Sequence, residues 1–241
     1  MIHVRNISFS YPDGNQALSD VSLDIAEGET VAVVGANGAG KSTLLALLVG
    51  ILAAKEGEIE IAGIPVKKGR LEEIRRKVGF VFQNPDDQLF MARVYDDIAF
   101  GPRNFGFGQQ ESKRMADRAI EIMKIEHLRD RAPHKLSGGE KRNVAIAAVL
   151  AMDPEVLLFD EPSSYLDPKS RRNFIRAMEA LEHTKLIATH DLDLVLDLCE
   201  RVVILKQGRV FADGSPMDVF LNRELMEESG LEIPLSMQRR A

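Results

Sequence analysis

A run of consecutive residues, Gly35 to Ser42, has the types and spacing of a loop that binds phosphate groups. It reads G-A-N-G-A-G-K-S and fits the pattern G-x-x-x-x-G-K-[ST] at every fixed position. Glycines let the main chain wrap closely around phosphates, and successive N–H groups converge on the anion. Lys41 adds a point charge for the β- and γ-phosphates, and Ser42 offers a hydroxyl to Mg²⁺. The segment predicts a nucleoside triphosphate site, of the kind that kinases, GTPases and ATPases share.

The surroundings of this loop favour that prediction over a glycine-rich turn with no ligand. A buried strand, 31–34, precedes the loop, and a helix predicted over 41–52 follows it, so the helix dipole also favours an anion. The residues expected to contact the nucleotide here are Gly35, Asn37, Gly38, Ala39, Gly40, Lys41, Ser42 and Thr43.

Two carboxylates follow another apolar strand, Val156–Phe159. Ligands of doubly wound sheets gather beyond the carboxyl ends of strands, so Asp160 and Glu161 are expected near the phosphate loop. Asp160 would join the Mg²⁺ shell, and Glu161 would orient and deprotonate the attacking water as a general base. Without the phosphate loop, two acids after a strand would fit a solvated turn equally well.

The segment Ser137-Gly138-Gly139-Glu140 opens a predicted helix. Ser137 and Glu140 have the spacing of a capping box. The two glycines weaken the first turn and leave backbone N–H groups open to an anion.

Strand and helix patterns alternate along the chain, which indicates an α/β protein with a largely parallel sheet. The predicted strands are Val21–Ile25, Val31–Val34, Glu58–Ala62, Val78–Phe82, Val156–Phe159, Leu186–Thr189 and Val202–Leu205. The predicted helices are Lys41–Leu52, Ser112–Lys124, Gly138–Met152, Pro168–Leu181 and Asp191–Glu200.

The rhythm breaks between residues 84 and 152, where we predict helices and loops but no strand, and therefore an inserted helical lobe. Gly101–Gly108 is predicted to be a loop within it. After Gly214, short helices are predicted over Met217–Leu221 and Glu224–Ser229, without an assigned role.

Composition restricts the class of protein. The chain has 241 residues, 45% of them apolar, and a formal net charge of −6, which argues against nucleic acid as a partner. The single cysteine, Cys199, is expected to be a buried apolar residue and not a reactive thiol. The longest apolar run, Val144–Met152, is too short to cross a bilayer, so we expect a soluble protein with any membrane part on another chain.

The segment Leu136–Glu140 resembles the signature motif of ABC ATPases, and the resemblance extends from Ile2 to about Gly214. It implies a P-loop NTPase core with an antiparallel β portion on its N-terminal side and an inserted α-helical subdomain. The implied division is 1–83 with 153–214 for the nucleotide-binding core, 84–152 for the helical lobe and 215–241 for a helical tail.

The resemblance also gives roles to residues that would otherwise pass as core or surface. Tyr11 resembles the aromatic that stacks on adenine. Gln83 resembles the Q-loop glutamine, near the γ-phosphate and the Mg²⁺. His190 resembles the switch histidine, and Ser164–Asp167 resembles the D-loop that crosses the dimer.

The implied mechanism needs two chains, because each chain has one phosphate loop and one signature segment. Ser137, Gly138 and Gly139 of one copy would clamp the ATP held by Lys41 of the other, which would be an identical chain or a close paralogue. Integral membrane subunits would be the further partners, at the cytoplasmic face of the cell membrane.

A narrower resemblance rests on the Q-loop continuation, Gln83–Phe90. It is similar to the ATPases of energy-coupling factor transporters, which take up vitamins or transition-metal ions. The structural alternative for this segment is an ordinary Asx/Pro turn that starts the helical lobe. The alternative functions are an importer or other conventional ABC ATPase, a non-transport ABC protein of translation or DNA repair, and a P-loop kinase or GTPase.

Three residues depart from the family pattern. Glu140 stands where Gln is frequent and adds negative charge near a phosphate site. Asn143 stands where Arg is common, which puts a local ion pair in doubt. Tyr165 stands where the D-loop usually has a small residue.

Overall fold

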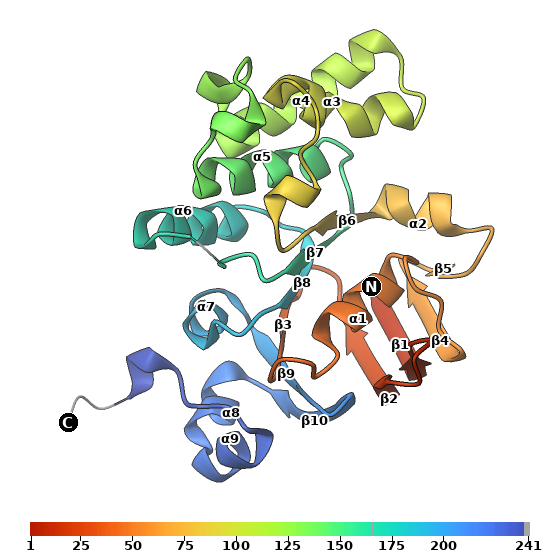
Figure 1. Cartoon of the computed structure of the whole chain (residues 1–241), viewed down its shortest axis with the longest axis vertical. Helices are drawn as coiled ribbons and strands as arrows, with labels where there is room; N and C mark the ends of the chain where they lie inside the picture. The colour runs from red at the N-terminus through yellow and green to blue at the C-terminus, as the bar shows by residue number, and fades with distance from the viewer. Residues whose placement is uncertain (165, 239–241) are drawn as a thin grey trace. The chain divides into compact units, whose positions relative to one another are not determined.

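The computed structural model describes residues 1–164 and 166–238, so the departure at Tyr165 lies outside the described residues. The chain divides into two compact units (Figure 1). The first contains residues Met1–Arg75 and Glu182–Ala241, and the second contains Arg76–Leu181. Helix α2, Leu71–Lys77, spans the sequence boundary between them.

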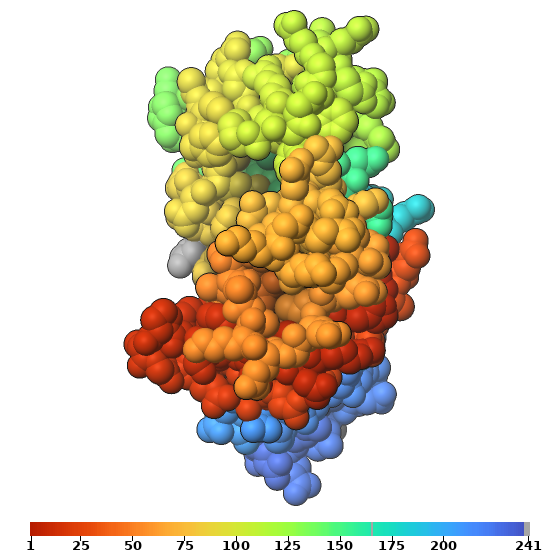
Figure 2. Space-filling model, turned by 90° about the vertical axis from the view of Figure 1, so that its right-hand side faces the viewer, coloured from red at the N-terminus to blue at the C-terminus, as the bar shows by residue number. Residues whose placement is uncertain are grey.

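The first unit begins with an antiparallel sheet in the order β2-β1-β4-β5. Its strands are β1 (Ile2–Ser10), β2 (Gln16–Ile25), β4 (Glu56–Ile61) and β5 (Ile64–Pro65). Strand β1 pairs with both β2 and β4, and the N-terminal residues in red and the following segment in orange lie next to each other in Figure 2. This sheet is the antiparallel portion that the family resemblance implies.

The other strands of this unit run in the order β10-β9-β3-β8. They are β3 (Thr30–Val34), β8 (Thr184–Ala188), β9 (Arg201–Lys206) and β10 (Arg209–Gly214). Strand β3 is parallel to β8 and to β9, and every residue of β3 and β8 is buried, as the continuous apolar runs indicate. No prediction covered the edge strand β10, whose residues are mostly half-exposed.

Among the residues that the structure describes, four helices belong to the first unit alone. They are α1 (Lys41–Leu48), α7 (Leu192–Leu198), α8 (Pro216–Leu221) and α9 (Arg223–Ser229), followed by a short 3-10 turn, Leu235–Met237. Helix α1 is shorter than predicted because the chain turns at Gly50, whose φ of 67° is left-handed. The predicted tail helices are present: Phe220 and Met226 are buried in a core cluster with Val202 and Ile204.

Cys199 is half-buried against this cluster. Burial raises the pKa of its thiol to about 12, so the thiol stays protonated and unreactive at neutral pH.

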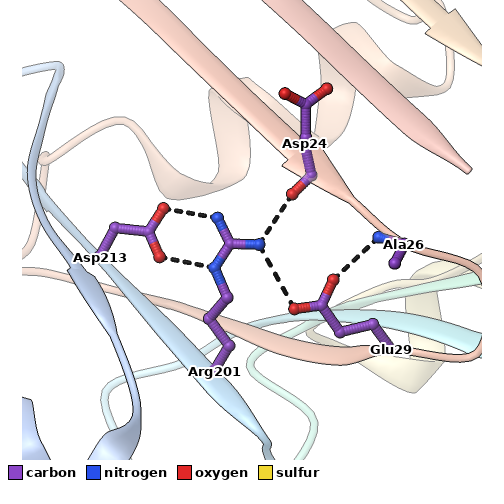
Figure 3. Close-up of polar contacts among 5 residues, drawn as sticks. All are labelled: Asp24, Ala26, Glu29, Arg201 and Asp213. Atoms are coloured by element: carbon purple, nitrogen blue, oxygen red, sulfur yellow. Dashed lines mark hydrogen bonds and ion pairs between the residues drawn. The ribbon is translucent and has the colours of Figure 1, made fainter.

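Arg201 holds together β9, β10 and the end of β2 (Figure 3). Its guanidinium donates two hydrogen bonds of 2.6 Å to the carboxylate of Asp213, and a third, of 2.9 Å, to the carbonyl oxygen of Asp24. It also lies 3.3 Å from Oε1 of Glu29, whose other oxygen accepts from the N–H of Ala26 at 2.8 Å. Hydrogen bonding to Asp213 raises the pKa of Arg201 above its ordinary value. The network joins residues far apart in the sequence.

Arg201→Gln is expected to lower the free energy of unfolding by about 1–3 kcal/mol, because it removes a bidentate, partly buried ion pair. Arg5→Gln is the matched control, since Arg5 and Asp24 form a solvent-exposed pair at 2.7 Å whose loss should destabilise the protein much less. Denaturant unfolding of both variants measures the difference. Equal stability of the two variants would contradict this role for Arg201.

The second unit contains two parallel strands, β6 (Val78–Val81) and β7 (Val156–Asp160), with Val81 opposite Phe159. Its helices are α3 (Val94–Asn104), α4 (Gln109–Met123), α5 (Gly138–Leu150) and α6 (Pro168–Glu179), with 3-10 turns at Pro85–Asp87, Glu126–Leu128 and Pro133–Lys135. Helices α3, α4 and α5 pack against one another (Figure 1). From residue 84 to 152, all of which the structure describes, the chain forms helices and connections only.

The prediction of a loop over Gly101–Gly108 is wrong in its first half. Helix α3 continues through Gly101 and Pro102 to Asn104, and only the residues after Phe105 connect to α4. Ile98 and Pro102 lie on one buried face, and a side chain at Gly101 would come within 3.0 Å of the sulfur of Met152. Close packing therefore overrides the low helix propensity of glycine and proline.

Within the residues that the structure describes, no helix has the length and apolar character needed to cross a membrane.

Candidate nucleotide-binding site

The phosphate loop joins the end of β3 to the start of α1, and its glycines are required by close contacts. Gly35 has a φ of 155°, and a Cβ there would collide with the carbonyl oxygen of Leu205. Gly40 has a φ of 105°, and a Cβ there would lie 2.6 Å from the carbonyl oxygen of Ala17. Both positions therefore exclude any residue larger than glycine.

Two side chains at the start of α1, Lys41 and Thr43, contact the phosphate loop or the residue beside it. Lys41 is only 8% exposed, and its Nζ donates to the carbonyl oxygen of Gly35 at 2.7 Å and to that of Ala36 at 3.4 Å. Thr43 is buried, and its hydroxyl lies 3.0 Å from the Tyr11 hydroxyl. The ammonium group of Lys41 therefore lies against the phosphate loop, and the Tyr11 hydroxyl lies next to Thr43.

The N-terminus of α1 is left for an anion. No side chain caps it, as is also the case at α3 and α4, but the first turn of α1 contains no acidic residue whereas the first turns of α3 and α4 do. The first-turn N–H groups and the helix dipole therefore suit a phosphate group. The chemistry of this loop suits a triphosphate, and a serine hydroxyl such as that of Ser42 is the type of hard oxygen ligand that Mg²⁺ prefers.

His190 follows β8, the neighbour of β3. The two strands are parallel, with Val33 opposite Ala188, so the phosphate loop and His190 leave the same edge of the sheet. Thr189 is fully buried, and its N–H donates to the carbonyl oxygen of Val33 at 3.0 Å, whereas His190 is exposed. The structure therefore brings this histidine to the carboxyl end that bears the loop.

In the second unit, too, predicted site residues follow the carboxyl ends of parallel strands: Gln83 follows β6, and Asp160 and Glu161 stand at the end of β7. Strands β6 and β7 are parallel neighbours, and these residues follow their carboxyl ends. Asp160 and Glu161 are 8% and 7% exposed. Glu161 has a φ of 46°, a left-handed conformation that costs a non-glycine residue about 1 kcal/mol or more. Such strain is frequent at functional sites.

The signature segment forms the capping box that its spacing predicts. The Ser137 hydroxyl accepts from the Glu140 N–H at 3.3 Å, and Oε2 of Glu140 accepts from the Ser137 N–H at 2.8 Å. These bonds lower the pKa of Glu140, and Arg131 lies 3.5 Å from its other oxygen. The extra negative charge of Glu140 is thus bound by the Ser137 N–H and lies near Arg131.

The signature turn contacts the start of α6. A Cβ at Gly139 would lie 2.5 Å from the Ser170 hydroxyl, which itself donates to Asp167 at 2.6 Å. A cavity of about 670 Å³ opens beside this contact, and Asn143 lines it, so the second departure from the family pattern faces open space.

Sequence reasoning missed two residues that hold the Q-loop. Arg142 donates to the carbonyl oxygens of Phe82 and Gln83, both at 2.6 Å. Gln88 accepts from the Phe82 N–H at 3.2 Å and donates to the Ala145 carbonyl oxygen at 2.8 Å. In the sequence, the only hint of this role is that the positively charged Arg142 stands next to the apolar run of α5, and on its own that position suggests only an exposed residue near the helix start.

Comparisons with known proteins agree with this arrangement. The family model described as "ABC transporter" matches residues 18–164. The energy-coupling factor transporter ATP-binding protein EcfA of Carboxydothermus hydrogenoformans is 43% identical over 97% of this chain and 87% of its own.

Solved structures are similar over nearly the whole chain. CbiO1 of Clostridium perfringens, described as part of the ABC transporter complex CbiONQ, has a TM-score of 0.83 and 39% identity over 94% of this chain and 93% of its own. The dimeric post-hydrolysis ATP-binding cassette MJ0796, bound to ADP and Pi, has a TM-score of 0.81 and 29% identity over 90% of this chain and 99% of its own. By motif, fold and relatives, this chain belongs to the ABC transporter family, as an ATP-binding and ATP-hydrolysing subunit.

Proposed function

We propose that this chain powers an energy-coupling factor type uptake transporter by closing around ATP as one half of an ATPase dimer. The observation that carries the proposal is that one chain has a single phosphate loop and a single Ser137-Gly138 turn, and that this turn is exposed and so accessible to a second copy. A dimer of such chains would have two complete sites. The dimeric form of the related cassette MJ0796 supports this.

Each residue group has one task in this proposal. Tyr11 stacks on the adenine, the backbone of Gly35–Thr43 cradles the phosphates, and Lys41 binds the β- and γ-phosphates. Ser42, Gln83 and Asp160 hold Mg²⁺, which neutralises phosphate charge when it is bound. In the part of the chain that the structure describes, no group of three or more His, Cys, Asp or Glu side chains could hold a metal ion, which fits an ion held partly by the phosphates.

Hydrolysis then follows from general base chemistry. Glu161 accepts a proton from the attacking water, whose oxygen bonds to the γ-phosphorus as the bond to the leaving ADP oxygen breaks. His190 donates a hydrogen bond to the γ-phosphate, and the partner chain's signature turn stabilises its other side.

The dimer closes because ATP binds the closed state more tightly than the open one. Loss of the γ-phosphate removes that difference, and the dimer opens. Gln83 and the helical lobe carry the motion to membrane subunits at the cytoplasmic face of the membrane.

An aromatic pair in this lobe supports a protein partner. Phe90 is 63% exposed and Phe100 is 38% exposed, and their rings meet edge to face with centroids 5.0 Å apart. Exposed apolar patches of this kind mark interaction surfaces.

The energy-coupling factor assignment rests on the sequence Gln83–Phe90 and on the identity to EcfA and CbiO1. Its cargo would be a vitamin or a transition-metal ion. A conventional ABC importer is the second candidate.

Affinity purification from gently solubilised native membranes, with mass spectrometry of the partners, tests the proposal. We expect a membrane protein with several spanning segments, together with this chain or a close paralogue. Recovery with a ribosome or a DNA-repair complex would contradict a transport role, and recovery with an extracellular solute-binding protein's permease would favour the conventional importer.

A further inference from the structure

Arg142 is the largest side chain in the core that is almost fully buried, with 1% of its surface exposed. It lies in the helix α5 that begins at the signature turn. Burying a guanidinium costs several kcal/mol unless its donors are satisfied and its charge is compensated. Here Nη1 and Nη2 each donate at 2.6 Å, but Nε is buried without a hydrogen-bond partner in the described structure. Stability alone does not explain a cation at this position.

The two acceptors are consecutive carbonyl oxygens, those of Phe82 and Gln83. Because the guanidinium is planar and rigid, two such bonds fix the orientation of the peptide plane between them. The backbone of the Q-loop glutamine is therefore held in place by a residue of the signature helix.

Two further contacts join the same segments. Nζ of Lys141 lies 2.6 Å from Oδ1 of Asp86, and Gln88 bridges the Phe82 N–H and the Ala145 carbonyl oxygen. The Q-loop from Phe82 to Gln88 is thus attached to α5 at several points.

The charge of Arg142 also acts on the carboxylate of Asp160. Burial lowers the pKa of Arg142 to about 10, and the nearby Asp160 partly offsets that effect. The group remains protonated at neutral pH.

We propose that Arg142 is a positioning residue that clamps the Q-loop to the signature helix, so that Gln83 and Ser137 move as one body. Ser137 lies five residues before Arg142, about 7.5 Å along a helix that transmits displacement rigidly. This inference rests on the proposed function, in which Gln83 contacts the Mg²⁺ and ATP bound by its own chain and Ser137 contacts the ATP bound by the partner chain. The clamp would couple the two ATP sites of the dimer.

The test compares Arg142→Gln and Arg142→Lys with Arg114→Gln, an exposed arginine of α4 whose Nε is 2.9 Å from Glu111. Hydrogen–deuterium exchange, equilibrium ATP titration, steady-state hydrolysis and thermal unfolding are measured for each. Arg142→Lys keeps the charge but cannot donate to both carbonyls from one plane, so it should fall between wild type and Arg142→Gln.

In Arg142→Gln without nucleotide, we expect the amides of residues 82–88 to exchange about tenfold faster or more. The affinity of the phosphate loop for ATP should stay within about twofold, while kcat falls about tenfold and the Hill coefficient for ATP drops toward one. Arg114→Gln should behave as wild type.

Unchanged exchange of residues 82–88 would overturn the clamp, and faster exchange with a wild-type kcat and Hill coefficient would overturn the coupling. If Arg142→Gln is poorly folded, the same readings on Arg142→Lys decide. If ATP does not slow hydrogen exchange of residues 35–43 in the wild-type protein, the proposed function is contradicted. Exchange measured without nucleotide would still test the clamp.

Discussion

Replacing Glu161 with glutamine is expected to slow ATP hydrolysis by about 10²–10⁴-fold while leaving ATP binding intact, because the amide cannot accept the proton of the attacking water. Glutamine keeps the length of the side chain, so the left-handed backbone at this position, with its φ of 46°, is retained. With hydrolysis blocked, the ATP-bound closed dimer should accumulate. Phosphate release measures the rate, and light scattering with ATP measures the mass of the assembly.

Glu155→Gln is the matched control for this prediction. Glu155 precedes the same strand, β7, and pairs with Lys77 in a half-exposed ion pair, so its replacement should leave hydrolysis unchanged. A Glu161→Gln protein that hydrolyses ATP at nearly the rate of the wild type would remove Glu161 from the role of base. A monomer with ATP bound would contradict the dimer separately.

Lys41→Ala is expected to weaken ATP binding about 100-fold or more, which corresponds to about 2.8 kcal/mol. The reason is that a buried ammonium, 8% exposed and held over the phosphate loop by the Gly35 carbonyl oxygen, has no substitute within the loop. In a partly desolvated site its attraction to phosphates is far stronger than in water. Equilibrium titration with a fluorescent ATP analogue measures the change.

Lys55→Ala removes the same charge from an exposed position of the same unit and controls for the change in net charge. Its ATP affinity should match that of the wild type. Unchanged affinity in Lys41→Ala, or an equal loss in both variants, would mean that the loop is not the phosphate site.

The strands that the sequence predicted well are those with a local signal. Strands β3 and β7 are apolar at four of five positions, and β8 is apolar over Leu186–Ala188, because both faces are covered, and such runs are visible without knowledge of the fold. Helix α3 lacked that signal, because Gly101 and Pro102 are poor helix formers that only packing against the end of α5 makes acceptable. Strand β10 at the sheet edge was missed for a related reason, since its half-exposed residues do not alternate clearly.

The individual motifs of the site were determined by the sequence, because each depends on a few neighbouring residues. The glycines and lysine of the phosphate loop, the Ser137–Glu140 capping box and the carboxylates after β7 carry their chemistry in their own spacing.

Only the tertiary structure decided which of them meet. Parallel pairing sends His190 and the phosphate loop to one sheet edge, and Gln83 and Glu161 to the ends of neighbouring strands. It also joins Arg142 to the carbonyl oxygens of residues about 60 positions earlier, a contact that no local pattern encodes. Hydrogen bonds to backbone carbonyls do not depend on the identity of the residue that supplies them, so the sequence around Phe82 and Gln83 carries no trace of their partner.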